Sequence, residues 1–389
     1  MTLNNLYYIV FTLFSFYMIQ YIDFYVPILD NYWDIWFALN LALVMVLKNP
    51  KLKVRFFSDN EELFNKMIGN RIQNIECRMQ KNNNIQFYSL SDLNDYIPSK
   101  TIFTFFDYKL QSNYLKKWEI WKNIIQFWYF LLHKWIENLH LTNYKINWNT
   151  FTHFIPSLRE NTGWIIIQQI KNKRLKTKEE YLNYLKSKYD LDIKITSDLL
   201  NKKWISVFVY KDTLKEIIEI IQERKNEVFF LFDSWKRIQK SIIPWKYTKQ
   251  SIKDSGLNPE WQFFHIFFMP FLELLDYNDF LSICDCNIVR WENSLCTSLS
   301  SWKPTFWDIY KENNKAHDEK IDDFLIFLEE NKIQELEYSK ILKNFNSIYK
   351  KEAFSSFLNN YQNYTNLFQN LWIYINNNCD LYKKLEKIF

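Results

Sequence analysis

The sequence predicts an α/β protein made of two Rossmann-like halves followed by a helical C-terminal segment. Strand-like and helix-like runs alternate from residue 22 onward, which is typical of βαβ units around a parallel sheet. A second alternating series begins near residue 204, and from residue 316 the apolar residues keep helical spacing. With 389 residues, of which 48% are hydrophobic and 24% charged, the chain is long enough for two domains with separate cores.

The individual elements are predicted from β-branched and aromatic runs for strands and from apolar residues at helical spacing for helices. The expected strands lie at 22–29, 52–57, 101–106, 205–210, 228–232, 261–269 and 287–289. The expected helices lie at 35–47, 58–67, 114–139, 214–224, 279–283, 324–328, 341–345 and 361–372. Asp34 is expected to cap the first helix, and Ser58-Asp59 the second, because short polar side chains bind the N–H groups at a helix start.

The composition excludes several classes of function. A net charge of +5 is modest and does not mark a nucleic-acid-binding protein. The five cysteines form no CxxC pair and the five histidines no metal-ligand spacing, so neither a disulfide framework nor a zinc site is expected. Cys284 and Cys286 are expected in a buried strand, and a reducing cytoplasm is the simplest compartment.

The N-terminal stretch from residue 6 to residue 22 carries no charge and, at about 17 residues, reaches the lower limit for a membrane span. It has two interpretations, an N-terminal anchor or an extension upstream of a true start at Met18. We favour the second, because residues 22–29 already serve as the first strand, and so expect no membrane association.

Glycine is unusually rare. The chain has 3 Gly and 16 Trp, whereas average usage gives about 7% Gly. In the strand-to-helix turn at 30–36, tryptophans stand where a tight turn favours glycine. One hypothesis is that the genome reads UGA as glycine, so that several of these tryptophans are glycine in the protein as synthesised.

Three segments lie where an open α/β sheet places its ligands, after the carboxyl ends of strands. The first is the pair Asp30 and Asp34, which could fix a turn and cap a helix or could supply a general base. The second is the stretch 290–294, where Arg290 and Ser294 flank a helix start that suits a diphosphate, or form an ordinary surface turn. The third is 208–210, whose aromatic side chains could stack on a nucleobase or belong to the core.

Together these segments resemble the EF-P arginine rhamnosyltransferases, the EarP family. The family motif D-N-[FY]-G-D-I-G is matched by 30–36, and a strand ending in F-C-Y by 208–210. The longest match is C-D-L-N-F-V-R-G-E-D-S, seen at 284–294, and it continues into G-K-P and W-x-I-Y at 302–310. Looser matches lie at 154–164 and 270–277. The matches follow one another in order from residue 23 to about residue 325.

Several tryptophans fall on family glycines, while Trp307 falls on a family tryptophan. Those on family glycines are Trp33, Trp36, Trp164, Trp291 and Trp302. This placement supports the recoding hypothesis, which predicts UGA at these five codons and UGG at codon 307. The chain departs from the family at Asn293, where the family has Asp, at Leu274, where it has Gln, and at Thr297, where it has Arg.

The resemblance implies a GT-B-like α/β fold, with two Rossmann-like domains facing a cleft and C-terminal helices crossing back. It implies an apolar extension at 1–21, an acceptor-binding domain at 22–200, a nucleotide-sugar-binding domain at 201–360 and a returning helix at 361–389. It implies an inverting transfer of L-rhamnose from dTDP-β-L-rhamnose to an arginine of elongation factor P, with no metal and no cofactor.

The resemblance also implies roles for named residues. Asp34 would be the general base, with Asp30 orienting the acceptor or holding Asp34 in place. The donor would be bound by Phe208, Tyr210, Phe271, Arg290, Glu292, Asn293 and Ser294. Two alternatives stay open: a GT-B transferase with another nucleotide sugar or acceptor, which Leu274 and Asn293 leave room for, and a non-catalytic nucleotide-binding protein, which genuine indoles at 33 and 291 would favour.

Overall fold

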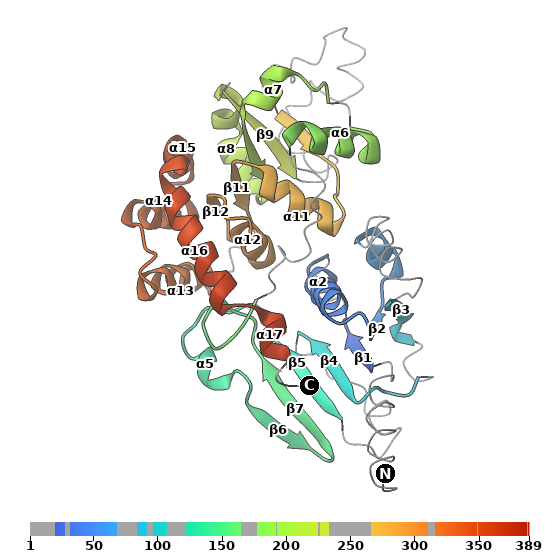
Figure 1. The fold of residues 1–389 in the computed structure, drawn as a ribbon. Coiled ribbons are helices and arrows are strands. Elements are labelled where there is room, and N and C mark those ends of the chain that lie inside the picture. Colours follow the sequence, from blue (N-terminus) through green and yellow to red (C-terminus); the bar gives the residue numbers. More distant parts are fainter. Residues whose placement is uncertain are drawn as a thin grey trace, which may run out of the picture. The chain divides into compact units, whose positions relative to one another are not determined.

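The computed structural model describes two compact α/β units (Figure 1). The described residues are 20–27, 32–67, 84–91, 96–106, 122–164, 177–191, 193–224, 226–232, 266–309, 316–347, 349–386 and 388. Unit 1 comprises 1–129, 139–154 and 385–389, and unit 2 comprises 130–138 and 155–384. The chain therefore passes from one unit to the other after residues 129, 138, 154 and 384.

Unit 1 contains a seven-stranded sheet in the order β3-β2-β1-β4-β5-β7-β6. Its strands are β1 (Gln20–Tyr25), β2 (Leu52–Ser58), β3 (Ile85–Ser89), β4 (Thr101–Phe105), β5 (Asn123–Phe127), β6 (Asn143–Ile146) and β7 (Asn149–Phe154). All neighbouring strands are parallel except β6 and β7, which form an antiparallel hairpin. Helix α2 (Tyr32–Lys48) follows β1. The short helix α5 (Ile136–Leu139), which precedes β6, belongs to unit 2 except for its last residue.

The core of unit 1 is aromatic. The ring of Phe24 on β1 stacks on Phe103 at 5.0 Å between centroids and packs at 5.4 Å from Phe105. Phe37 on α2 meets Phe105 edge to face at 6.0 Å. All five residues of β4 are buried, as expected of a central parallel strand whose two faces are both covered.

Part of the helix predicted at 114–139 is wrong, because residues 123–127 form β5 between β4 and β7. Residues 124–127 are buried on both faces, and periodicity alone cannot distinguish a short run of this kind from a buried helix. Of the predicted range, 136–139 is helical, and 114–121 lies outside the described residues.

Two predicted caps are also corrected. Asp34 is the third residue of α2 rather than its N-cap, because the helix begins at Tyr32. The helix at 61–67 is capped by Asn60, whose Oδ1 accepts the N–H of Leu63 at 2.8 Å, rather than by Ser58-Asp59. The side-chain oxygen of an asparagine accepts an N–H group at the helix start as that of an aspartate does. The type of cap was therefore predicted correctly, but its position was one residue away.

Unit 2 contains a five-stranded, fully parallel sheet in the order β10-β9-β8-β11-β12. Its strands are β8 (Lys203–Val207), β9 (Glu227–Phe232), β10 (Ile266–Met269), β11 (Cys286–Val289) and β12 (Thr305–Trp307). The helices around it are α6 (Lys178–Tyr189), α7 (Ser197–Asn201), α8 (Lys211–Glu223), α11 (Leu274–Ile283) and α12 (Glu292–Leu299). Cys286 lies in β11 as predicted, whereas Cys284 is the C-cap of α11; both are buried.

Helices α6 and α7 pack onto the second sheet, although α6 and all but the last residue of α7 lie before residue 201. Tyr181 and Leu185 of α6 and Leu199 of α7 share one buried cluster with Trp204 and Phe230. The domain division at 200/201 stays a prediction, and the contacts place 155–200 in unit 2.

The C-terminal segment is helical, as predicted. It consists of α13 (Ala316–Glu330), α14 (Leu336–Asn346), α15 (Lys350–Asn360), a short 3₁₀ turn (Tyr361–Tyr364), α16 (Thr365–Asn378) and α17 (Leu381–Leu385). The link between α16 and α17 returns to the loop 155–164, where Trp164 N–H donates to the Cys379 carbonyl at 2.7 Å. Among the described helices, none has the length and apolar content needed to cross a bilayer.

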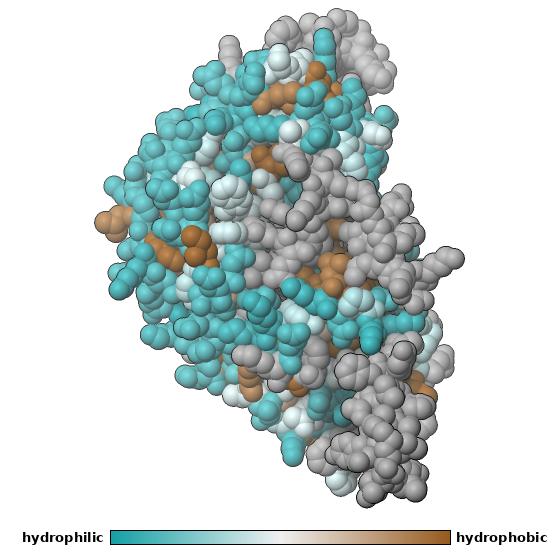
Figure 2. Space-filling model, viewed as in Figure 1, coloured by the Kyte–Doolittle hydropathy of each residue, from teal (hydrophilic) through white to brown (hydrophobic). Residues whose placement is uncertain are grey.

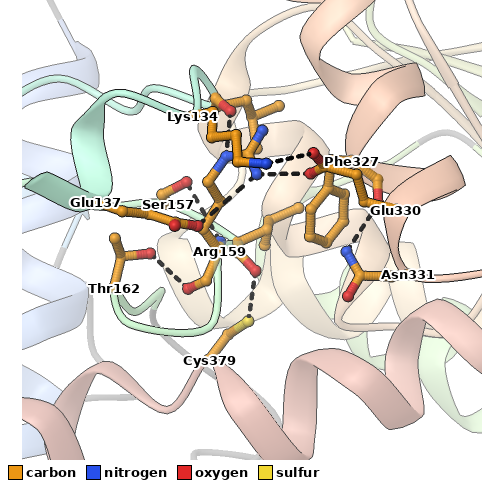
Figure 3. A network of polar contacts seen from close by, with 11 residues as sticks. Lys134, Glu137, Ser157, Arg159, Thr162, Phe327, Glu330, Asn331 and Cys379 are labelled. Atoms are coloured by element: carbon orange, nitrogen blue, oxygen red, sulfur yellow. Dashed lines mark hydrogen bonds and ion pairs between the residues drawn. The ribbon is translucent and has the colours of Figure 1, made fainter.

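Arg159 fastens the loop 155–164 to its neighbours within unit 2 (Figure 3). Its buried guanidinium donates to the Leu132 carbonyl at 2.6 Å and to Glu330 at 2.8 Å, and Glu137 lies 3.8 Å away. The hydrogen bond from Arg159 holds the pKa of Glu330 below its usual value. One side chain thereby joins segments from three parts of the sequence.

Gly163 occupies a site without room for a side chain, because a Cβ there would lie 2.8 Å from the backbone Cα of Leu381. We expect Gly163→Ala to lower the free energy of unfolding by about 1–3 kcal/mol, since backbone cannot yield as a flexible side chain can. Urea denaturation measures this as a lower midpoint at unchanged slope. Glu160→Ala, an exposed change in the same loop, is the control, and equal midpoints for the two variants would contradict the expectation.

Hydrophilic residues cover most of the described surface on the face shown in Figure 2, and brown hydrophobic residues occur there in small groups. The large apolar side chains that are exposed include Trp148, Leu336 and Trp302. Scattered exposed apolar residues are normal on proteins and identify no binding site.

Candidate functional site

The parallel sheet of unit 2 reverses its strand order at β8, which lies between β9 and β11. Ligands of open α/β sheets bind outside the carboxyl ends of the strands at such a switch point. Residues 208–210 follow β8, and residues 290–291 follow β11. The topology therefore brings two of the three predicted segments together.

Arg290 is enclosed by aromatic rings at this point. Its guanidinium carbon lies 4.0 Å from the ring centroid of Phe208, 4.2 Å from Trp291 and 5.3 Å from Tyr210. One guanidinium nitrogen donates to the Val209 carbonyl at 3.4 Å. Each such ring stabilises the cation by about 0.5–2 kcal/mol and fixes the plane of its N–H groups.

The hydroxyl of Tyr210 stays protonated at neutral pH. Burial raises its pKa well above the usual value, and the carboxylates of Glu292 and Asp308 act in the same direction, while Arg290 opposes them. Burial likewise raises the pKa of Tyr277, whose ring centroid lies 6.2 Å from that of Phe208. Both hydroxyls are therefore hydrogen-bond donors rather than anions.

Helix α12 begins at Glu292, two residues after Arg290, so its first-turn N–H groups and its dipole form the type of helix start that binds anions. Ser294 Oγ accepts the N–H of Trp291 at 3.0 Å and donates to the Trp291 carbonyl at 2.9 Å. Asn293 is buried, and Glu292 pairs with Lys320 at 3.0 Å. Ser294 here caps its own helix, and must exchange one of these bonds to reach a phosphate.

Phe271 is placed differently from the other predicted donor-binding residues. It follows β10, which is two positions from β8 in the sheet, and its side chain is 38% exposed. Leu274, at the position of the family glutamine, is buried in the first turn of α11.

Unit 1 repeats the topology around Asp34. Strand β1 lies between β2 and β4, so the order of the strands reverses at β1, and α2 begins after β1. Asp34 is buried in the first turn of α2, where the helix dipole favours a negative charge. Asp30 lies outside the described residues, as does the side chain of Trp33.

The other tryptophans on family glycines differ in backbone conformation. Trp302 has φ of 59° and is 43% exposed, so a bulky residue takes the left-handed conformation that glycine favours. Trp291 has φ of −100°, and Trp164 is buried against the ring of Phe130 at 4.8 Å. Of the described residues among the five, Trp302 has the glycine-type backbone.

Trp302→Gly should raise the free energy of unfolding by about 1 kcal/mol, because it removes the cost of a left-handed conformation with a Cβ. Trp302→Ala is the matched control, since it removes the indole and keeps the strain. Urea denaturation compares the two, and a gain of the same size in both variants would contradict the backbone argument. Peptide mass of the natively produced protein reads the residue at 302 directly.

The residues that fix the backbone of Arg290 and Tyr210 were not predicted from the sequence. Trp307 donates its indole N–H to the Arg290 carbonyl at 3.1 Å, and the Asp308 carboxylate accepts the N–H of Tyr210 at 2.9 Å. Trp307 was visible only as a match to a family tryptophan, and Asp308 carried no signal. Within the part of the chain that the structure describes, no group of three or more His, Cys, Asp or Glu residues could hold a metal ion.

Known structures share this fold. The solved structure described as "Structural basis for EarP-mediated arginine glycosylation of translation elongation factor EF-P" aligns with a TM-score of 0.53 and 14% identity, covering 95% of this chain and 98% of that chain. UDP-GlcNAc 2-epimerase from Neisseria meningitidis bound to UDP-GlcNAc aligns with a TM-score of 0.53 and 10% identity over the same shares. At such identities the likeness shows the fold alone, and the predicted GT-B class is confirmed.

The sequence comparisons give the family. No curated protein sequence matches the chain. The profile of the family described as "Elongation-Factor P (EF-P) rhamnosyltransferase EarP" matches residues 22–389, which is most of the chain. The predicted resemblance is thereby confirmed, and the chain belongs to the EarP family of EF-P rhamnosyltransferases.

Proposed function

We propose that this protein transfers L-rhamnose from dTDP-β-L-rhamnose to an arginine side chain of elongation factor P, with inversion at the anomeric carbon. The family gives the reaction class and the protein acceptor. The observation that supports binding of a nucleotide-sugar donor is the position of the Arg290 guanidinium. It stacks among aromatic rings beside the start of α12, at a switch point of a parallel sheet.

Arg290 and α12 would hold the diphosphate of the donor. A stacked guanidinium has its N–H groups confined to one plane, which suits hydrogen bonds to phosphate oxygens. Ser294 would add a hydroxyl, and Glu292 and Asn293 would contact the sugar or the nucleoside. Phe208, Tyr210 and Phe271 would lie against the base and the sugar. As the glycosidic bond breaks, the same guanidinium and N–H groups would stabilise the departing dTDP.

Asp34 would act on the acceptor, helped by Asp30. A guanidinium has a pKa above about 12, so it is not deprotonated before the attack. Asp34 would align the guanidinium and accept one proton as the C–N bond forms and the C–O bond to the diphosphate breaks. Asp34 lies in the first turn of α2, where the helix dipole favours a negative charge.

The direct test is a transfer assay with purified protein, EF-P and dTDP-β-L-rhamnose. Mass spectrometry of EF-P peptides should show one deoxyhexose on one arginine, and EF-P with that arginine changed to lysine should stay unmodified. An EF-P that stays unmodified in the presence of active donor would contradict the proposal.

A second candidate, transfer from another nucleotide sugar, is favoured by the buried Leu274 and Asn293 at positions where the family has Gln and Asp. Both changes alter which hydrogen bonds the donor site offers. A panel of dTDP and UDP sugars in the same assay separates the two candidates, since only one donor should support modification at low concentration.

A further inference from the structure

The end of β12 is bonded to both loops of the candidate donor site. Asp308 N–H donates to the Val289 carbonyl at 2.7 Å, and its carboxylate accepts the N–H of Tyr210 at 2.9 Å. The neighbouring Trp307 donates its indole N–H to the Arg290 carbonyl at 3.1 Å. Two consecutive residues thus fix the segment after β8 against the segment after β11.

The Asp308 carboxylate belongs to a buried ion pair. Lys350, the first residue of α15, places its ammonium 3.7 Å from Asp308 Oδ1, and the two side chains are 6% and 2% exposed. The Thr213 hydroxyl lies between them, donating to Asp308 at 3.0 Å and accepting a hydrogen bond from Lys350. Each charge is therefore compensated inside unit 2.

Asp308 makes for α8 the bond that the N3 side chain of a capping box usually makes, because it accepts the N–H of the N-cap residue. The N-cap of α8 is Tyr210, which makes no capping hydrogen bond with its own side chain. The carboxylate that accepts the Tyr210 N–H belongs to Asp308, which directly follows β12 and lies 98 positions along the chain. The position of Tyr210 therefore depends on where β12 holds Asp308.

The strand end is itself held firmly. Asn346 at the end of α14 accepts the N–H of Ile309 at 3.0 Å and donates to the Trp307 carbonyl at 2.9 Å. A buried ion pair is a weak source of stability, because desolvation offsets most of the attraction. Such a pair does fix the positions of the groups that it bonds, here the Tyr210 N–H and the Thr213 hydroxyl.

We propose that Asp308 and Lys350 are positioning residues for donor binding, which act by fixing Tyr210 beside Arg290. The inference rests on the proposed function, because it assumes that Tyr210 and Arg290 contact the donor. In the W-x-I-Y pattern, Asp308 stands at the unspecified position.

Two double variants without the buried charges test this. Asp308→Asn/Lys350→Met keeps an oxygen that accepts the Tyr210 N–H, and Asp308→Leu/Lys350→Met has the same shape without that oxygen. We expect the Leu variant to raise the donor KM about tenfold, while kcat and the acceptor KM stay within about twofold. The Asn variant should stay within about threefold of the wild-type donor KM.

Lys351→Met is the matched control, because Lys351 also joins α15 to α8, through an exposed pair with Glu219 at 2.9 Å. It should leave the donor KM unchanged. A wild-type donor KM in the Leu variant, or an equal loss in the Asn and Leu variants, would overturn the proposal.

Hydrogen exchange tests the role of Asp308 independently of the identity of the donor. The amide of Tyr210 should exchange faster in the Leu variant than in the Asn variant, whichever nucleotide the protein binds. If wild-type protein uses no dTDP-sugar, the donor assignment fails, and equal exchange in the two variants would still overturn the role of Asp308.

Discussion

Asp34→Ala is expected to lower kcat for transfer to EF-P by about 10²–10⁴-fold, the usual contribution of a positioned acid or base. Alanine cannot accept the proton that the guanidinium loses as the C–N bond forms. Because Asp34 lies in unit 1 and the candidate donor site in unit 2, binding of dTDP should stay within about twofold of wild type. Single-turnover assays measure the first quantity and calorimetry the second.

Asp34→Asn separates charge from shape, since it keeps the size of the side chain and removes the base. It should be as slow as Asp34→Ala. Glu62→Gln, an exposed charge change in the same unit, is the control and should leave kcat unchanged. Turnover close to wild type in either Asp34 variant would remove Asp34 from the chemistry.

Arg290→Ala is expected to weaken dTDP binding by about 10–100-fold, the cost of losing hydrogen bonds between charged partners. The three rings that enclose the guanidinium would lose their cation at the same time. Calorimetry with dTDP measures the affinity, and thermal melting in the absence of ligand shows how much of the effect is structural.

Arg290→Lys is the informative comparison, because lysine keeps the charge but not the planar group that stacks and binds two oxygens. It should recover part of the affinity. Lys215→Met removes an exposed cation from α8 and should bind dTDP like wild type. Unchanged affinity in Arg290→Ala would contradict the phosphate assignment.

Much of the fold follows from local sequence. The strands predicted at 52–57, 101–106 and 228–232 are confirmed within one residue. The last two are apolar runs buried on both faces, and in the first buried residues alternate with the half-buried Lys53 and Arg55. The same property misled the prediction at 123–127, where apolar spacing fits a buried helix and a buried strand equally. The run becomes a strand because it pairs with β4 and β7, and local sequence does not reveal which strands will be its neighbours.

The candidate donor site was partly predictable. Phe208 and Arg290 follow strands that turned out to be adjacent, and carboxyl ends of parallel strands meet at one edge. The contact between Asp308 and Tyr210 was not predictable from the sequence, because it depends on the register of β12 against β11 and on the packing of α15. The roles of all the named site residues stay predictions until the variants are measured.

The chain passes repeatedly between the units, and this affects any attempt to produce unit 2 alone. A fragment that starts at residue 155 keeps the whole parallel five-stranded sheet but lacks 130–138. Arg159 would then lose the Leu132 carbonyl and the nearby Glu137. Truncation at a single point would therefore expose a surface that the intact chain fills, and a useful fragment would have to carry residues 130–138 as a grafted peptide.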